Sequence, residues 1–430
     1  MAKYKKTGGN FCEKESLYQY IAPNILAMVG ISCYILADTF FIATAQGTNG
    51  ITALNLALPI YGIIFAIGSM IGTGSAIRYA LAKATDQQEA KRYFSNALIW
   101  DVIVSVIFIA AGLFFPGQVM RVMGADTVIE SIGIPYTRIV LCFTPFFMMN
   151  YAFTAFVRND NAPHIAMAAT LLSSLFNIVF DYVFMFPLGM GMTGAALATA
   201  VSPIVSILIC MVHYLSPKSS VSFHFMVPSV KMLISSCSLG IVAFVGEIAS
   251  AVTTMVFNFV LLGLDGNTAV AAYGVIANTA LVGTAIFNGV SQGLQPLASE
   301  AHAKGEAEEK KKILTKSVLT GIVLTVVLIG SVWIFAPQIT DVFNSEHSEQ
   351  LAAYAVPGIR IYFAGFFAAA INIIFAGFLS ATDHAKESSI VAITRGIVAI
   401  IAFALVLPKF LGITGVWLAF PAARGAYFFL

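Results

Sequence analysis

The sequence predicts an all-α integral membrane protein in which twelve transmembrane helices form two pseudo-twofold-related bundles of six. Three observations predict this fold. The chain of 430 residues is 59% hydrophobic and only 10% charged, whereas charged residues make up about a quarter of a soluble domain. Its apolar segments reach the length of about 20 residues that a helix needs to cross a bilayer. A set of residues also recurs at one constant spacing, as in an internal repeat.

The apolar segments between polar breaks give the expected transmembrane helices in chain order. In the first half of the chain they cover residues 17–45, 51–77, 93–115, 128–156, 163–187 and 192–214. In the second half they cover 230–263, 268–298, 313–335, 350–380, 388–407 and 413–430, of which the last is the shortest. We therefore expect a first lobe at residues 1–215, a polar linker at 216–229 and a second lobe at 230–430.

The two halves share a sequence element. Pro187-x3-Gly191-x-Thr193-Gly194-x2-Leu197-Ala198 recurs at one constant offset as Pro408-x3-Gly412-x-Thr414-Gly415-x2-Leu418-Ala419. The same offset relates Gly68 and Gly72 to Gly289 and Gly293, and this glycine spacing in an apolar helix favours close helix packing. Because each half contains an even number of spans, both halves enter the membrane from the same side. The expected pseudo-twofold axis therefore runs along the membrane normal.

Basic residues predict the orientation. They gather in alternate loops, from the N-terminal tail through residues 78–92 and 304–316 to Lys386, whereas the opposite loops contain only Arg121 and Lys409. By the positive-inside rule both termini and the linker are cytoplasmic, so we expect a multi-pass protein of the cell membrane. The polar start of the chain lacks the apolar stretch of a cleavable signal, and the net charge of +2 gives no support for a nucleic-acid partner.

Cysteine and histidine spacing predicts no redox centre and no metal site built from these residues. The five cysteines are scattered without a CxxC pair, and the six histidines lack ligand spacing. We expect the cysteines to be packing residues, and we expect no organic cofactor.

A polar cluster in the first half is the strongest candidate site. Asp38 lies in the first span, Asn177 and Asp181 lie in the fifth, and Thr199 lies in the sixth. Asn177 and Asp181 are four residues apart and therefore share one helix face. Ionisable groups inside spans are costly, which makes each a functional candidate, and these oxygen donors suit Na⁺ or a shared proton. The alternative is interhelical hydrogen bonding.

The repeat sharpens this prediction, because the cluster has no counterpart in the second half. The corresponding positions there are all apolar: Phe259, Val398, Ala402 and Phe420.

Several other residues are candidates for the wall of a substrate cavity. Glu247 lies well inside the seventh span, where it either serves a cationic substrate or coupling ion or bonds to a neighbouring helix. Tyr34 lies one turn before Asp38, and Asn150 lies in the fourth span. Gln292 and Gln295 in the eighth span are weaker candidates.

Two further groups of residues have structural interpretations. Pro23 in the first span removes a backbone hydrogen bond and favours a helix kink, either static or one that bends when the carboxylates change protonation. A set of charged residues lies nearer to span ends, where snorkelling or ion pairing between helices is expected: Asp101, Arg138, Arg360, Arg395 and Arg424.

With these residues in place, the chain resembles the multidrug and toxic compound extrusion (MATE) family. The resemblance rests on the repeated halves, the segment Ala37-Asp38-Thr39-Phe40-Phe41-Ile42, Asn177-x3-Asp181 and the Gly-x-Thr-Gly-x2-Leu-Ala element. It is nearest to a prokaryotic branch with an acidic cluster in the first lobe. In that branch the residues matching Asp38, Asn177, Asp181 and Thr199 form the cation or proton site, and those matching Tyr34 and Asn150 line the cavity.

The resemblance also bears on the second lobe. Glu247 matches an acidic position that other branches use for coupling. Those branches carry a further acid in the tenth span, where this chain has only Asn372. The departure favours a site in the first lobe.

The resemblance implies a secondary antiporter that exports amphipathic, often cationic, organic compounds in exchange for H⁺ or Na⁺ by alternating access. We expect a monomer that is not an enzyme. Three alternatives stay open from the residues: a lipid-linked oligosaccharide flippase of the same superfamily, an intramembrane enzyme, and a structural or receptor-like bundle. An enzyme would need a catalytic pair or metal ligands at membrane depth, such as HExxH, which the sequence lacks; the polar group that we identify at that depth is the carboxylate cluster.

Overall fold

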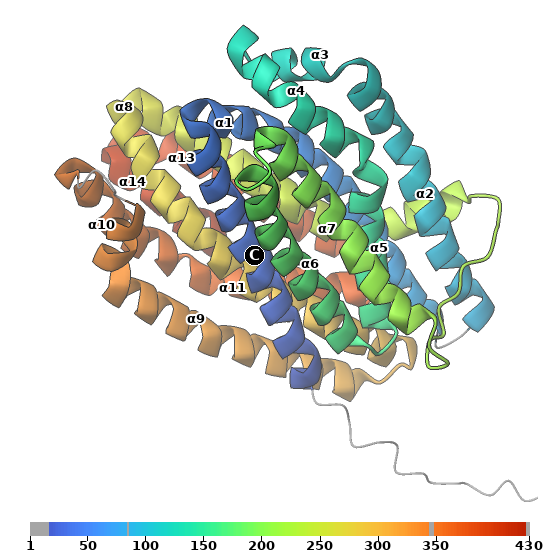
Figure 1. The fold of residues 1–430 in the computed structure, drawn as a ribbon. Coiled ribbons are helices and arrows are strands. Elements are labelled where there is room, and N and C mark those ends of the chain that lie inside the picture. Colours follow the sequence, from blue (N-terminus) through green and yellow to red (C-terminus); the bar gives the residue numbers. More distant parts are fainter. Residues whose placement is uncertain (1–16, 84–85, 344–347, 427–430) are drawn as a thin grey trace, which may run out of the picture.

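The computed structural model describes residues 17–83, 86–343 and 348–426, and the elements in these ranges are helices (Figure 1). The first half contains α1 (Leu17–Lys83), α2 (Gln87–Phe114), α3 (Pro116–Val122), α4 (Thr127–Cys142), α5 (Thr144–Asn159), α6 (Pro163–Met185) and α7 (Gly191–Tyr214). The second half contains α8 (Val230–Ala303), α9 (Ala307–Phe343), α10 (Glu349–Ala364), α11 (Phe366–Ala381), α12 (Ala385–Ile393), the π-helical turn η1 (Thr394–Val398), α13 (Ala399–Val406) and α14 (Pro408–Gly425).

The two longest helices, α1 and α8, each contain two transmembrane spans. Gly47 (φ 61°) interrupts α1, and Gly266 (φ 65°) interrupts α8. A positive φ is readily adopted by glycine alone, so these residues permit a sharp break without a long loop. The resulting spans are Leu17–Gly47 and Ala53–Lys83 in α1, and Val230–Gly266 and Thr268–Ala303 in α8. Both breaks were predicted from the polar segments that separate the apolar ones.

The predicted spans agree with the structure along most of the chain. In the described ranges nine helices are long and apolar enough to cross a membrane, and two bent pairs raise this number to eleven. The pairs are α4 with α5, bent by 47°, and α10 with α11, bent by 42°. The expected twelfth span corresponds to α14, which is interrupted at Gly412 and is described as far as Gly425. The remaining residues of that expected span, 427–430, lie outside the described residues.

The bends have local causes. A proline occupies the first turn of α5, directly after the break at Phe143. The other break is at Gly365, where a Cβ atom would lie 2.8 Å from the Cα atom of Pro421 in α14. Glycine there allows the backbone of α14 to pass close to the bend.

The repeat recurs in the backbone. Gly191 (φ 54°) and Gly412 (φ 56°), which are equivalent in the two halves, both adopt left-handed conformations at the turn between the last two spans. This confirms that the shared sequence element encodes the same turn twice.

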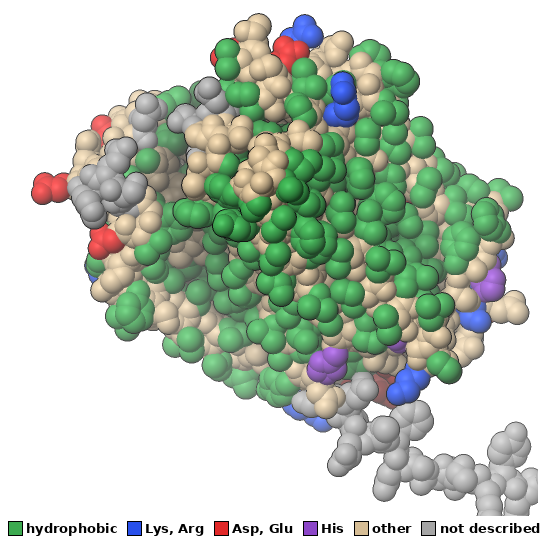
Figure 2. Space-filling view, in the orientation of Figure 1, with side chains coloured by type: hydrophobic (Ala, Val, Ile, Leu, Met, Phe, Trp, Pro, Cys, Tyr) green, Lys and Arg blue, Asp and Glu red, His purple; other side chains and the backbone are tan. Residues whose placement is uncertain are grey.

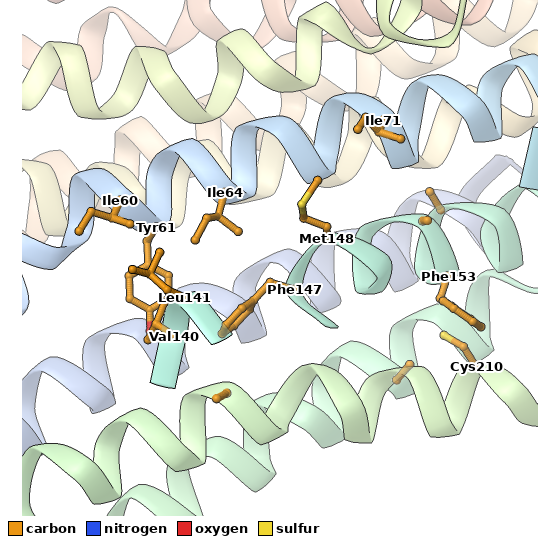
Figure 3. Packing of buried hydrophobic residues seen from close by; sticks show 14 of the residues in the cluster. Ile60, Tyr61, Ile64, Ile71, Val140, Leu141, Phe147, Met148, Phe153 and Cys210 are labelled. Carbon is orange, nitrogen blue, oxygen red and sulfur yellow. The ribbon is translucent and has the colours of Figure 1, made fainter. Parts of the chain in front are cut away.

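Buried side chains form two large hydrophobic clusters. One is built mainly from the second span of α1 together with α2–α7, and the other from α8–α11, α13 and α14. Figure 3 shows part of the first cluster, where Tyr61, Phe147 and Met148 interlock between neighbouring helices. The outer surface in Figure 2 is mostly hydrophobic, with charged side chains toward its edges, as expected for a protein surrounded by lipid.

The glycine pairs pack as close helix contacts, but with different partners. A Cβ atom on Gly72 would lie 2.6 Å from the backbone nitrogen of Ala152, so the second span of α1 touches the backbone of α5. A Cβ atom on the equivalent Gly293 would lie 2.7 Å from the Cα atom of Ile21 in the first span of α1. The same glycine spacing therefore joins helices within the first half and across the two halves.

A buried carboxylate, Asp160 in the α5–α6 turn, fastens the start of the linker to the first half. It accepts hydrogen bonds from Lys83 Nζ at 2.6 Å, from Tyr79 Oη at 2.6 Å and from the backbone nitrogen of Ser220 at 2.9 Å. His213 Nε2 lies 2.9 Å from Asp160 Oδ2, the oxygen that also accepts from Ser220. Burial alone would raise the pKa of Asp160, but the hydrogen bonds from Lys83, Ser220 and Tyr79 and the charge of Lys83 hold this pKa well below its usual range.

The linker remains attached to the first half along its length. The backbone nitrogen of His224 donates to Ser95 Oγ at 2.9 Å, and that of Ser229 donates to Asn96 Oδ1 at 2.7 Å. Both acceptors lie in α2.

Asp160→Asn should lower stability in a pH-dependent way. A carboxyl group with a depressed native pKa stabilises the fold above its unfolded pKa, and this contribution disappears as pH falls through the native value. We expect a loss of about 3 kcal/mol at pH 7, because Lys83 loses its buried partner. The difference from wild type should shrink below about pH 4. Melting temperatures in detergent between pH 3 and pH 7 test this, with the exposed Asp341→Asn as control. A difference that stays constant with pH contradicts the assignment.

Candidate functional site

The structure brings the four residues of the predicted cluster together between α1, α6 and α7. Asn177 and Asp181 are both 0% exposed, and Thr199 is 7% exposed. Asp38 is half-buried, and its carboxyl group is within hydrogen-bonding range of the Asp181 carboxyl group. The Oδ1 atoms of both aspartates are buried without a hydrogen-bond partner in the described part of the chain.

Asn177 links α6 to α7. Its amide nitrogen lies 3.2 Å from Thr199 Oγ1. With the amide group turned over, the nitrogen donates to Asp181 Oδ2 at 3.2 Å and the oxygen accepts from the backbone nitrogen of Thr199 at 3.2 Å. The turned orientation gives hydrogen-bond partners to both the amide nitrogen and the amide oxygen, so Asn177 connects the carboxyl pair to α7.

The tight turn between α6 and α7 sets this alignment. Gly189 (φ 62°) and Gly191 (φ 54°) reverse the chain within a few residues. A Cβ atom on Gly194 would lie 2.9 Å from Phe184 Cβ, so the two helices are close from the turn onward. This places the face with Asn177 and Asp181 against the face with Thr199.

The arrangement is suited to holding a monovalent cation or a proton. Two carboxylates in contact repel each other in a medium of low dielectric unless a proton or cation lies between them. The unpartnered Oδ1 atoms of Asp38 and Asp181, with the oxygens of Asn177 and Thr199, offer hard donors. Within the described ranges, no group of three His, Cys, Asp or Glu side chains is placed to hold a metal ion.

Glu247 of the second half reaches toward the same cluster. Its Oε1 atom accepts a hydrogen bond from Tyr151 Oη at 3.4 Å, and Tyr151 belongs to α5 of the first half. Tyr34 interacts electrostatically with Asp38, Asp181 and Glu247, so it lies near both acidic groups. Asn150 precedes Tyr151, and its Oδ1 atom is buried without a partner among the residues described.

Sequence reasoning missed a row of aromatic residues beside the cluster. Tyr61 Oη donates to Tyr136 Oη at 3.1 Å, and both phenols interact electrostatically with the aspartates. The ring of Phe65 lies 5.4 Å from that of Tyr61 and 6.0 Å from that of Tyr151. The available signal was the presence of tyrosines inside apolar spans, since a buried phenol needs a hydrogen-bond partner.

The structure places Gln292 and Gln295 away from the carboxyl cluster. Gln292 Oε1 accepts from Arg158 Nη1 at 2.7 Å, and Arg158 Nη1 also lies 3.0 Å from Asn24 Oδ1. Gln295 is buried nearby, where the last span of α8 packs against the first span of α1. Arg158 is only 5% exposed, and its hydrogen bond to Gln292 joins the two halves.

Pro23 lies beside this contact, next to Asn24. Within α1 only Gly47 departs from helical dihedral angles, so the backbone is helical at Pro23. A proline at this position nevertheless leaves one helical hydrogen bond unmade.

Comparisons with known proteins follow the same two-part organisation. A family profile described as MatE matches residues 23–183 and 242–406, one segment in each half. The chain is 25% identical over 415 residues to "Multidrug export protein MepA" of Staphylococcus saprophyticus, and the alignment covers 94% of this chain and 90% of the relative.

Solved structures share the fold. One is described as the outward-facing conformation of a multidrug resistance MATE family transporter of the MOP superfamily. It has a TM-score of 0.89 at 21% identity and covers 95% of this chain and 92% of that one. A MOP superfamily transporter from Pyrococcus furiosus, for which reversed polarity of the binding pocket suggests a different function, has a TM-score of 0.87 at 21% identity, with coverage of 95% and 93%. At this identity the likeness concerns the fold alone, with its twelve helices in two lobes.

Thr199→Val should destabilise the protein by removing the side-chain partner of Asn177. A buried polar group left unsatisfied costs about 1–3 kcal/mol, so we expect the melting temperature in detergent to fall by several degrees. Ser202→Ala is the matched control on α7, because among the described residues Ser202 Oγ bonds to the carbonyl oxygen of Thr199 in its own helix, at 3.1 Å. Equal effects of the two substitutions would mean that the contact with Asn177 contributes nothing.

Proposed function

Because this chain belongs to the MATE family of transporters, we propose that it is a secondary multidrug exporter that exchanges amphipathic, often cationic, organic compounds for inward-moving H⁺ or Na⁺. The observation that carries this proposal is the contact between Asp38 and Asp181, completed by Asn177 and Thr199. The similarity to a relative named as a multidrug export protein supports the substrate class.

Competition for negative charge would couple the two fluxes. A proton or Na⁺ ion between Asp38 and Asp181 cancels the charge that would attract a cationic substrate nearby. When the ion leaves, the carboxylates repel each other and regain affinity for an organic cation. Tyr34 and Glu247 extend this acidic region toward the second half, so a substrate there would contact both halves. Movement of α1 relative to α6, with bending near Pro23, would then accompany ion exchange.

Contacts between the halves support alternating access. A Cβ atom on Gly240 of α8 would lie 2.8 Å from the carbonyl carbon of Met70 in α1. Nearby, Arg78 Nη1 lies 2.8 Å from Asp383 Oδ1, and Arg78 Nε donates to the carbonyl oxygen of Ser235 at 3.2 Å. The expected orientation in the cell membrane, with both termini cytoplasmic, puts these contacts at the cytoplasmic side. We infer that the halves are closed there in this structure.

We propose that the moving bodies are the lobes expected from the sequence, residues 1–215 and 230–430. The separate hydrophobic clusters of the two halves support this division. Each monomer would then contain a complete transport pathway.

Asp38→Asn should abolish dye export while leaving the protein folded. Proteoliposomes loaded with ethidium measure export under an imposed Na⁺ gradient and, separately, under a pH gradient. We expect a reduction of about 100-fold or more under whichever gradient drives the wild type, because a neutral amide cannot exchange a cation at this position. Asp101→Asn is the control, since Asp101 is a fully buried carboxyl group outside the cluster. Unchanged export by Asp38→Asn would contradict the proposal.

Gly240→Val should block transport without removing substrate binding. A side chain at Gly240 would meet the backbone of Met70 and hold the halves apart. We expect ethidium to bind with its affinity within about threefold of wild type, but export to be lost. Gly263→Val in the same span of α8 is the control, because a Cβ atom there meets nothing within 4 Å. Normal export by Gly240→Val would show that closure at this contact is unnecessary.

A further inference from the structure

Two arginines of the second half lie side by side at the depth of the membrane. Arg395 lies in η1 and is 7% exposed, and Arg424 lies in α14. Arg424 Nη1 donates to the backbone carbonyl oxygen of Arg395 at 3.1 Å. The guanidinium carbon of Arg424 lies 5.0 Å from the centre of the Phe420 ring, and Asn372 Nδ2 donates to the carbonyl oxygen of Arg424 at 3.0 Å. Helices α11, α12–α13 and α14 are therefore joined around this pair.

Among the described residues, the two guanidinium groups have no acidic partner. Arg395 Nε, Arg395 Nη1 and Arg424 Nε are buried without a hydrogen-bond partner in residues 17–83, 86–343 and 348–426. In those same ranges no carboxylate forms an ion pair with either arginine, and residues 427–430 contain no acidic side chain. The charge of Arg424 acts on Arg395, so the two guanidinium groups lie close enough to repel each other. The sequence-based expectation of snorkelling or ion pairing is therefore wrong for Arg395.

Unpartnered guanidinium nitrogen atoms, on the buried Arg395 and the partly buried Arg424, are energetically unfavourable. A guanidinium group keeps its proton in proteins, so it cannot escape burial by becoming neutral as a carboxyl group can. Each unsatisfied buried donor costs about 1–3 kcal/mol, and the two positive charges also repel each other. Buried polar groups without partners in a native protein usually indicate a bound water or ion that completes them. One anion between the two arginines would satisfy the donors and cancel the repulsion.

The repeat places this pair at the counterpart of the cation cluster. Val398 and Phe420 are the positions equivalent to Asn177 and Thr199. Arg395 lies three residues before Val398, and Arg424 lies four residues after Phe420. Because the two spans run in opposite directions, both shifts move one helical turn toward the same side of the membrane. The same pair of helices thus carries Asp181, with Asn177 and Thr199, in the first half and two basic side chains in the second.

We propose that the second half binds a small inorganic monoanion, such as chloride, between Arg395 and Arg424. The unpaired nitrogen atoms are shielded from solvent, so a lipid headgroup or a drug-sized acid would need the helices to separate. A halide ion is much smaller than either of these ligands. The π-helical turn at Arg395 widens the helix locally, as such turns often do at functional sites.

Halide-dependent stability tests the proposal on the full chain. The melting temperature is measured in phosphatidylcholine nanodiscs in sodium gluconate, sodium chloride and sodium bromide at equal Na⁺ concentration. We expect chloride and bromide to raise the wild-type melting temperature by several degrees, with saturation, since a ligand that binds only the folded state stabilises it. Arg395→Met should lose this dependence and be at least as stable as wild type in gluconate, because it removes the unpaired cation. Arg138→Met, at an exposed arginine of α4, should keep the full dependence.

A second measurement locates the ion directly. Crystals grown in sodium bromide should show an anomalous difference peak between the two guanidinium groups. The proposal is overturned if the wild-type melting temperature is the same in halide and in gluconate and the crystals show no such peak. Both measurements use the wild-type protein, so neither depends on the folding of a variant. Halide dependence that persists in Arg395→Met also overturns it. If phosphatidylglycerol nanodiscs raise the melting temperature in gluconate and halide does not, the two arginines bind a lipid phosphate, and the small-ion proposal is wrong.

Discussion

The bilayer imposes one constraint on which the rest of this structure depends: each backbone polar group must find a partner inside the protein. Helices satisfy the constraint for themselves, so the chain leaves the helical conformation only at a few places. Gly47, Gly266 and Gly412 are three of these places, and each adopts dihedral angles that favour glycine. The positions of the glycines thus decide where spans end, and the ends of the spans decide which side chains meet.

Much of the fold could be predicted because this constraint is local. Span length, loop polarity and the repeated turn at Gly191 and Gly412 are all properties of short segments. Helical spacing places Asn177 and Asp181 on one helix face, and the tight turn between α6 and α7 places Thr199 beside them. Asp38 was identified as costly at membrane depth, and the structure brings it to Asp181.

Contacts between distant segments could not be predicted in the same way. Glycine spacing indicates that a helix will be approached closely, but Gly72 meets α5 whereas the equivalent Gly293 meets α1. The interaction of Arg158 with Gln292 and that of Tyr151 with Glu247 also join residues of different halves. Such pairs depend on how the halves dock, and periodicity contains no information about docking. The position of a charged residue in the sequence was also misleading: Arg395 lies near the end of a predicted span, yet its side chain is buried.

The attachment of residues 219–229 to the first half has a mechanical consequence. A free linker of that length would let the two halves separate, slide and rotate with little restriction. Asp160, Ser95 and Asn96 instead hold it against the first half as far as Ser229. The flexible joint is thereby reduced to the peptide units at the start of α8. In the proposed transport cycle the second half would then turn about the start of α8, so that one angle of opening would describe most of its movement.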